Sequence, residues 1–490
     1  MRFSWFRERD FPTKHLSTPA MNHKPKRFAV LLALCALPTF AMPAALATSQ
    51  LRAQITVPSD SAIRAILQNR IDTKRAVGIV AATLDHGRSR IYTAGSSGAP
   101  GVPLDGNTIF EIGSITKVFT ASLLADMVAR GEVQLDDPVA KYLPTSVRVP
   151  SRNGKQITLL DLSTQSSGLP RMPTNFMPAD NNNPYADYTV AQMYAFLSSY
   201  ELTRDIGVQY EYSNLGVGLL GHALALKGGK SYETLVTERI LRPLGMNDTR
   251  ITLSPAMKSR LAPGHSASGG VVANWDLPTL TGAGALRSTA NDMLKFLAAN
   301  LDSTSAPLGR VLATTHFARR DVNGAQMRIG LNWHILNAFG LPVVWHNGGT
   351  GGYRTFIGFD QANNRGAIVL SNQSVSPDDI GFHLLDERAP LAPPPSTKAR
   401  TEIAVDPAVL ETYVGVYQLA PTFAITITRE GASLYGQATG QQGFQLFAEA
   451  PMEFFLKEVD AQITFEKDPA GKVTRLILHQ GGMDLPGLKK

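Results

Sequence analysis

The sequence predicts an α+β fold (an α/β sandwich) in which helices pack on an antiparallel sheet, followed by a smaller all-β domain. A helical apolar pattern over Ser59–Ala76 precedes two β-rich runs, Val77–Leu84 and Ser89–Ala94. The residues between those runs, Asp85-His86-Gly87, are typical of a hairpin turn. A strongly apolar helical run then extends from Ser114 to Arg130. A helix, a hairpin and a second helix in this order favour a sheet covered by helices.

Length and composition indicate several folded domains. The chain has 490 residues, of which 43% are hydrophobic, with 42 Gly and 31 Pro. A chain of this size can bury a large core and is expected to form two or three domains. The Gly and Pro contents are ordinary and do not indicate a fibrous or disordered protein.

The N-terminal region has the three parts of a secretion signal. Met21–Arg27 is basic, Phe28–Leu37 is apolar and Ala45-Leu46-Ala47 is a small-residue cleavage site. The apolar run is too short to span a bilayer in the mature protein. We expect export to the periplasm or the medium, with translation starting at Met1 or at Met21.

The same region holds the only cysteine and most of the excess charge. Cys35 lies in the apolar run, so the mature chain has no disulfide, thiolate metal site or cysteine nucleophile. Residues 1–47 contain seven Lys/Arg and two Asp/Glu, so their removal lowers the net charge from +7 to +2. No basic patch indicates a nucleic-acid partner.

The central part alternates helical and β-rich patterns around one long irregular stretch. Met172–Tyr188 is rich in Pro and Asn without periodicity, and a loop of that length is typical of a functional region. Helices are expected at Ile157–Leu162, Tyr188–Tyr200, Leu215–Leu226, Ser231–Leu241, Thr289–Asn300 and Asp378–Asp386. Strands are expected at Ile329–Leu336, Val343–His346, Thr355–Phe359 and Gly366–Leu370.

A proline-rich hinge, Pro390–Pro395, is the predicted boundary of the second domain. The β-rich runs after it are short and regularly spaced, which is typical of a small antiparallel barrel or sandwich. They are Ala424–Thr428, Ser433–Gly436, Phe444–Phe447, Glu453–Lys457, Gln462–Glu466 and Val473–His479.

Ser114 and Lys117 form the only Ser-x-x-Lys in the chain. At this spacing the two side chains share one helix face, and a desolvated lysine can accept the proton of a nucleophilic serine. The alternative is a serine helix cap beside a solvated lysine. The apolar helix around Lys117 favours the catalytic interpretation, because a buried unpaired ammonium is costly.

Two further segments supply groups that acyl transfer needs. Tyr212 and Asn214 lie in the only Tyr-x-Asn, and Tyr212 can move a proton if nearby lysine charge lowers its pKa. His346-Asn347-Gly348-Gly349 ends an apolar strand, where glycines admit a substrate backbone and the N–H of Gly349 can join that of Ser114 in an oxyanion hole. By themselves, both segments can equally be ordinary turns.

Together the three motifs carry a resemblance. The order Ser114-Ile115-Thr116-Lys117, Tyr212-Ser213-Asn214 and His346-Asn347-Gly348 resembles the serine β-lactamase and penicillin-binding-protein superfamily. The similar branch contains class C β-lactamases, DD-peptidases, D-amino-acid peptidases and related esterases. The similarity extends from about Ser59 to Asp386, with Ser167-Gly168-Leu169-Pro170 among the matching segments.

This resemblance implies a five-stranded antiparallel sheet with flanking helices, a helical subdomain, and a site between them. The domain at 48–389 is then a serine hydrolase, after a signal region at 1–47. A linker at 390–402 leads to a barrel at 403–490 that resembles the lipocalin-like domains of some members. From this domain organisation we expect that the chain can form a homo-oligomer through contacts between the barrels of two subunits.

The resemblance also implies residue roles. Ser114 attacks the substrate carbonyl, while Lys117 and Tyr212 move protons. Asn214, His346, Gly348 and Gly349 are expected to contact substrate. His346 stands where class C β-lactamases carry Lys, so the cation there is weak and pH-dependent, and Arg354 is a candidate replacement for contact with a substrate carboxylate. His at this position resembles the DD-carboxypeptidases more closely.

Other chemistries lack their signatures. The histidines are scattered without His-Glu-x-x-His, so neither a metal nor another cofactor is expected. The Gly-x-Ser-x-Gly motif of α/β-hydrolases is absent, so that fold is not expected. We expect cleavage of amide bonds in β-lactams or D-Ala-type peptides. The alternatives are an esterase of small acyl esters and a non-hydrolytic penicillin-binding sensor or scaffold.

Overall fold

A computed structural model describes residues 56–490, with gaps at 303–306, 324–325, 339–340, 395–399, 421–422, 440–442, 457–460 and 481–482. The predicted signal region, residues 1–47, and part of the predicted linker lie outside the described residues. Within the described part, no helix is both long and apolar enough to cross a membrane.

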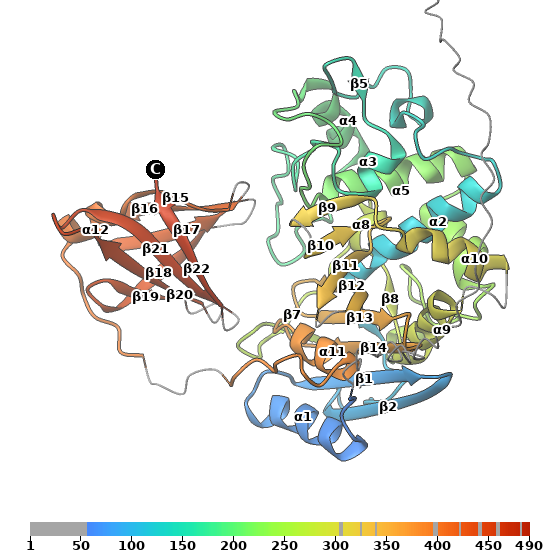
Figure 1. Cartoon of the computed structure of the whole chain (residues 1–490), viewed down its shortest axis with the longest axis horizontal. Coiled ribbons are helices and arrows are strands. Elements are labelled where there is room, and N and C mark those ends of the chain that lie inside the picture. Colours follow the sequence, from blue (N-terminus) through green and yellow to red (C-terminus); the bar gives the residue numbers. More distant parts are fainter. Residues whose placement is uncertain are drawn as a thin grey trace, which may run out of the picture. The chain divides into compact units, whose positions relative to one another are not determined.

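The first domain is built on one antiparallel sheet with the strand order β2-β1-β14-β13-β12-β11-β10-β9 (Figure 1). The antiparallel sheet is confirmed, but it has eight strands rather than the five that were expected. Its strands are β1 (Gly78–Asp85), β2 (Arg88–Gly95), β9 (Arg320–Asn323), β10 (Met327–Ile329), β11 (His334–Ala338), β12 (Leu341–Gly349), β13 (Arg354–Asp360) and β14 (Arg365–Ser371).

Strands β10 and β11 come from a region that the sequence suggested was a single strand, and β9 was not predicted. The predicted strand Ile329–Leu336 is divided between β10 and β11, because the chain turns between them. Asn332 in this turn has a φ of 56°, a left-handed conformation that asparagine tolerates better than most residues. The short strands β9–β11 therefore continue the sheet as a meander beyond β12.

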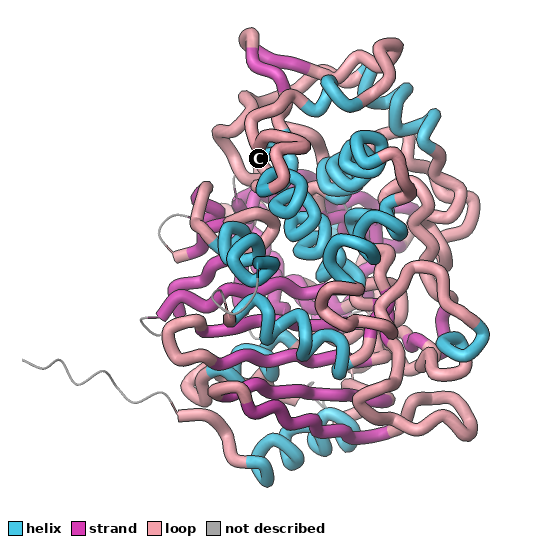
Figure 2. Tube along the Cα trace, turned by 90° about the vertical axis from the view of Figure 1, so that its right-hand side faces the viewer, coloured by secondary structure: helices cyan, strands magenta, loops and turns pink. Residues whose placement is uncertain are grey.

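Both faces of the sheet are buried under helices (Figures 1 and 2). Along β1, Ile79 and Ala81 pack with α1 (Asp60–Asp72) and α11 (Asp378–Leu385), while Val80 and Ala82 belong to the larger core on the opposite face. Successive strand residues point to opposite faces, so two buried faces make the strand continuously apolar. This explains the uninterrupted apolar run in the sequence.

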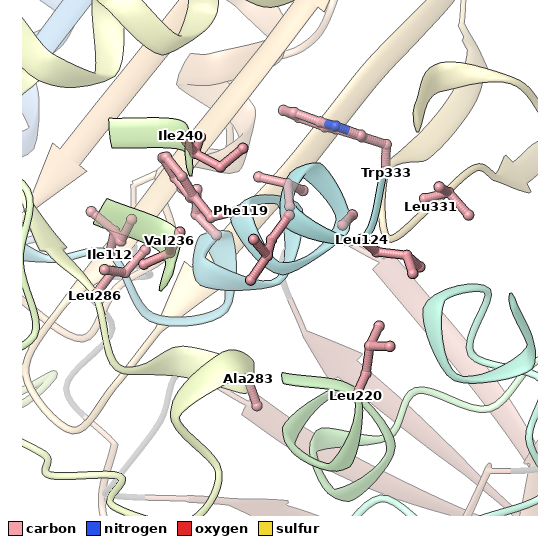
Figure 3. Packing of buried hydrophobic residues seen from close by; sticks show 14 of the residues in the cluster. Ile112, Phe119, Leu124, Leu220, Val236, Ile240, Ala283, Leu286, Leu331 and Trp333 are labelled. Atoms are coloured by element: carbon pink, nitrogen blue, oxygen red, sulfur yellow. The ribbon is translucent and has the colours of Figure 1, made fainter. Parts of the chain in front are cut away.

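Helix α2 (Thr116–Ala129) forms the centre of the larger core. All residues from Thr116 to Met127 are buried, and Phe119 stacks on Phe296 of α9 (Ala290–Leu301) with ring centroids 4.0 Å apart. Figure 3 shows this helix among side chains from several elements. The candidate nucleophile, Ser114, immediately precedes this buried helix, and Lys117 lies in its first turn.

The other helices of this domain are short or of medium length. The predicted helix Ser231–Leu241 divides into α6 and a π-helical turn, Thr237–Leu241. The remaining helices are α3 (Leu159–Ser163), α4 (Val190–Ser199), α5 (Asn214–Gly228), α6 (Tyr232–Val236), α7 (Pro255–Lys258), α8 (Thr281–Gly284) and α10 (Pro307–Ala313). Of these, α3, α4, α5 and α6 match predicted helices, whereas α7, α8 and α10 were missed.

The C-terminal domain is a closed antiparallel barrel with its own apolar core. Six strands match the predicted runs, whereas β15 and β22 were missed. Pro486 and Gly487 interrupt the β pattern of β22, which is why the sequence did not indicate this strand. The glycine is needed for close packing, because a Cβ on Gly487 would lie only 2.7 Å from the Leu419 side chain of β15. The strands are β15 (Gly415–Ala420), β16 (Phe423–Glu430), β17 (Ser433–Ala438), β18 (Gly443–Ala450), β19 (Glu453–Phe455), β20 (Ala461–Lys467), β21 (Val473–Gln480) and β22 (Met483–Lys489).

Candidate active site

Glycines bring the Ser114 turn and strand β12 into direct contact. Ser114 lies in a 3-10 turn, Gly113–Ile115, immediately before α2. Gly113 has a φ of +51°, and a Cβ on it would lie 2.6 Å from the backbone N of Gly349. A Cβ on Gly348 would lie 2.0 Å from the carbonyl oxygen of Ile112. Any larger residue at these positions would separate the N–H groups of Ser114 and Gly349.

Lys117 is fully buried with its amine next to the Ser114 hydroxyl. Its Nζ lies 3.0 Å from Ser114 Oγ, 2.8 Å from Asn214 Oδ1 and 2.6 Å from the carbonyl oxygen of Ala283. Burial, with a smaller effect of the Arg171 charge, holds the pKa of Lys117 well below its usual value. A neutral amine that donates its two hydrogens to Asn214 and Ala283 directs its lone pair at Ser114.

Tyr212 lies on the other side of this pair. Lys117 Nζ is 4.8 Å from the centroid of its ring, and its hydroxyl group lies close enough to Ser114 for that serine to lower its pKa. Burial raises the pKa of Tyr212 to about 12, although Ser114 and the Arg171 charge lower it. The prediction that nearby lysine charge lowers this pKa is therefore wrong, and Tyr212 is a protonated phenol at neutral pH.

Asn214 is held at the first position of α5. The preceding residue, Ser213, caps that helix by accepting a 2.8 Å hydrogen bond from the N–H of Gly216. The Asn214 amide donates to the Tyr185 hydroxyl at 3.3 Å, while its oxygen accepts from Lys117. The start of α5 thus fixes the Asn214 side-chain amide, which in turn orients Lys117.

The third motif forms the end of β12. His346 to Gly349 pair with β13, but β11 begins at His334, opposite Trp345, so this side of β12 has no strand neighbour among the described residues. The His346 ring lies 6.3 Å from the Tyr212 ring. Burial lowers the pKa of His346 well below its usual value, so the pH-dependent cation expected there is a neutral ring near pH 7.

The motifs border one cavity of about 460 Å³, into which no Asp or Glu side chain of the described residues is directed. Lys117 and His346 lie behind the cavity wall rather than in it. Sequence reasoning missed several lining residues, since single residues in loops carry no spacing pattern. The lining residues are Ser114, Arg171, Tyr185, Tyr212, Asn214, Trp275, Leu277, Ala283, Gly284, His334, Asn347, Gly348, Gly349, Thr350 and Arg354.

Arg354 lines the cavity beside Gly349. One guanidinium nitrogen donates to the carbonyl oxygens of Thr350 and Tyr353, at 2.6 and 2.9 Å. His334 also lines the cavity; its Nε2 lies 2.9 Å from the Tyr210 hydroxyl, and burial lowers its pKa to about 4. Across the described residues, no His, Cys, Asp and Glu side chains cluster in a way that can hold a metal ion.

Comparisons with known proteins agree with this geometry. The sequence profile described as Beta-lactamase matches residues 63–388, and one described as a domain of unknown function (DUF3471) matches residues 399–487. The lipocalin-like character of the barrel thus stays a prediction. The D-alanyl-D-alanine-carboxypeptidase/endopeptidase AmpH of Escherichia coli (strain K12) is 33% identical over 314 residues, which is 61% of this chain and 80% of that protein.

A second relative and a solved structure extend the comparison. The Penicillin-binding protein 4* of Bacillus subtilis (strain 168) is 26% identical over 74% of this chain and 84% of its own length. A class C beta lactamase from Rhodobacter sphaeroides has a TM-score of 0.55 and 25% identity, covering 64% of this chain and 94% of that one. The predicted family is confirmed: the chain belongs to the beta-lactamase family and is a serine hydrolase.

Proposed function

We propose that the protein cleaves amide bonds of D-Ala-type peptides or β-lactams through an acyl-serine intermediate. The observation that carries the proposal is the buried Lys117 amine, 3.0 Å from Ser114 Oγ and with a lowered pKa. A neutral lysine is a base at neutral pH, and a serine needs such a base to become a nucleophile.

In acylation, Ser114 Oγ attacks the carbonyl carbon and Lys117 accepts the hydroxyl proton. The N–H groups of Ser114 and Gly349 then stabilise the oxyanion. Collapse of the intermediate breaks the C–N bond, and Tyr212 donates its proton to the departing nitrogen while Lys117 returns a proton to Tyr212. In deacylation, water attacks the ester and gives its proton to the same groups, which restores Ser114.

The substrate orientation follows from these roles. Tyr212 protonates the departing amine, so the leaving group lies at the Tyr212 and His346 end of β12. His346 and Gly349 are separated by roughly 10 Å along the strand. The acyl part therefore lies toward Gly349, where the free edge of β12 can pair with a peptide backbone.

The D-Ala preference is supported by the third motif and by the Escherichia coli relative, whose name states D-alanyl-D-alanine-carboxypeptidase activity. Asn214 is proposed to bind the substrate amide, and Gly348 to give the substrate access to the strand. Export to the periplasm or medium and a homo-oligomer through the barrel are further proposals, of which export rests on residues 21–47.

A substrate panel with mass spectrometry tests this function. We expect penicillin to add its mass to the intact protein at Ser114, and a D-Ala-D-Ala peptide to release D-alanine. A persistent penicillin adduct without peptide turnover would favour a sensor, whereas turnover of a nitrophenyl ester alone would favour an esterase. No adduct with any of these compounds would contradict the proposal.

Arg354 is proposed to contact a carboxylate on the acyl part of the substrate. Arg354→Ala is expected to lower kcat/KM for a succinyl-capped peptide about 10-fold more than for its butyryl-capped counterpart, because a charge-assisted hydrogen bond is lost. Steady-state kinetics on both peptides provides the comparison, and Arg354→Lys should recover part of the difference. An unchanged preference in the alanine variant would exclude this role.

A further inference from the structure

Arg171 is a second cation, besides Arg354, that lines the cavity. It follows Pro170 at the start of the Met172–Tyr188 loop, is exposed and lines the cavity. Its Cζ lies 5.0 Å from the centroid of the Tyr212 ring. Tyr212 in turn faces His346, so Arg171 lies at the end of β12 where the leaving group is expected.

The backbone of Arg171 is fixed to the segment that carries the second motif. Its carbonyl oxygen accepts hydrogen bonds from the N–H groups of Asn214 and Leu215, at 3.0 and 3.3 Å. The position of Arg171 relative to Tyr212 is therefore set by main-chain contacts that do not depend on its side chain.

The guanidinium group is available for a ligand. Among the described residues no carboxylate pairs with it, since the neighbouring Glu211 forms its ion pair with Arg204. An arginine that contacts only a ring face keeps most of its five N–H donors free. Facing a cavity without acidic side chains, such a group is suited to a planar anion, which it can bind through two parallel hydrogen bonds.

We propose that Arg171 binds the carboxylate of the leaving group, an inference that rests on the function proposed above. Both proposed substrate classes carry a carboxylate on the carbon next to the scissile nitrogen. Tyr212 donates a proton to that nitrogen, and Arg171 lies against Tyr212. His346 is neutral and does not line the cavity, so it does not supply this charge.

The test compares an N-acyl-D-Ala-D-Ala peptide with the same peptide bearing a C-terminal carboxamide. The quantity measured is the ratio of kcat/KM for the free acid to that for the amide. Arg171→Ala is expected to lower this ratio about 10- to 100-fold, mainly through KM, because one charge-assisted contact is lost. Arg171→Lys should recover part of the ratio, and Arg171→Glu should invert it.

Arg148→Ala is the matched control, because Arg148 is also exposed on the same domain but does not line the cavity. It should keep the wild-type ratio. Equal losses on both peptides in Arg171→Ala, or a shifted pH profile with the ratio unchanged, would overturn the inference and leave the proposed function standing. A wild-type protein that hydrolyses neither peptide and forms no penicillin adduct would overturn both.

Discussion

Ser114→Ala is expected to lower kcat/KM on any substrate of the protein by at least about 10⁴-fold, because the group that forms the covalent bond is removed. Penicillin should no longer add its mass to the protein. The measurements are initial rates on peptide, cephalosporin and ester substrates, together with intact mass after exposure to penicillin. Residual activity near the wild-type level on any of them would contradict the nucleophile assignment.

Ser122→Ala serves as the control for this variant. Ser122 lies in α2, the buried helix that follows Ser114, where its hydroxyl donates to the carbonyl oxygen of Val118 at 2.7 Å. The substitution removes one buried hydroxyl from α2 without touching the cavity. We expect full activity and a small loss of stability, about 1 kcal/mol. Equal inactivation of both variants would point to damage to the helix rather than loss of a nucleophile.

Lys117→Met is expected to lower the rate of acylation about 10³-fold, since general-base catalysis by a positioned group typically contributes 10² to 10⁴. Methionine resembles lysine in length but cannot accept the Ser114 proton. Stopped-flow acylation with a chromogenic cephalosporin measures the step directly. Lys227→Met, at an exposed position of α5, is the control and should keep wild-type rates. Acylation of Lys117→Met at the wild-type rate would exclude the lysine as base.

The pH dependence of acylation should identify the same group. Lys117 acts as base only when neutral, so activity falls as pH drops through its lowered pKa. Tyr212, with a pKa of about 12, stays protonated throughout the neutral range and limits activity only at very high pH. An acid limb that persists unchanged in the residual activity of Lys117→Met would assign that limb to another group.

Lys117 also links stability to pH. Its pKa is lower in the folded state than in the unfolded state, where it is about 10.4. Between these two values the unfolded chain binds more protons, so the free energy of unfolding rises with pH across this interval. Denaturant titrations of wild type and Lys117→Met should show this rise only in the wild type.

The sequence by itself determined the elements that local patterns encode. The uninterrupted apolar pattern of α2 predicted a buried helix, and the serine and lysine at its start predicted a nucleophile with a base one turn away. The hairpin before it, the glycines of the third motif and most barrel strands were also readable, because turn residues and β alternation act over a few residues. The family followed from the order of three such motifs.

Other features depended on contacts between distant segments. Sequence spacing could not show that burial makes His346 neutral and keeps Tyr212 protonated, because desolvation depends on every element packed around a group. It also could not show that β9–β11 extend the sheet, or that Arg171 lies over the Tyr212 ring while Arg354 lies beside Gly349. Charge, proton affinity and distance in the cavity were therefore decided by tertiary packing, which joins residues that no local pattern connects.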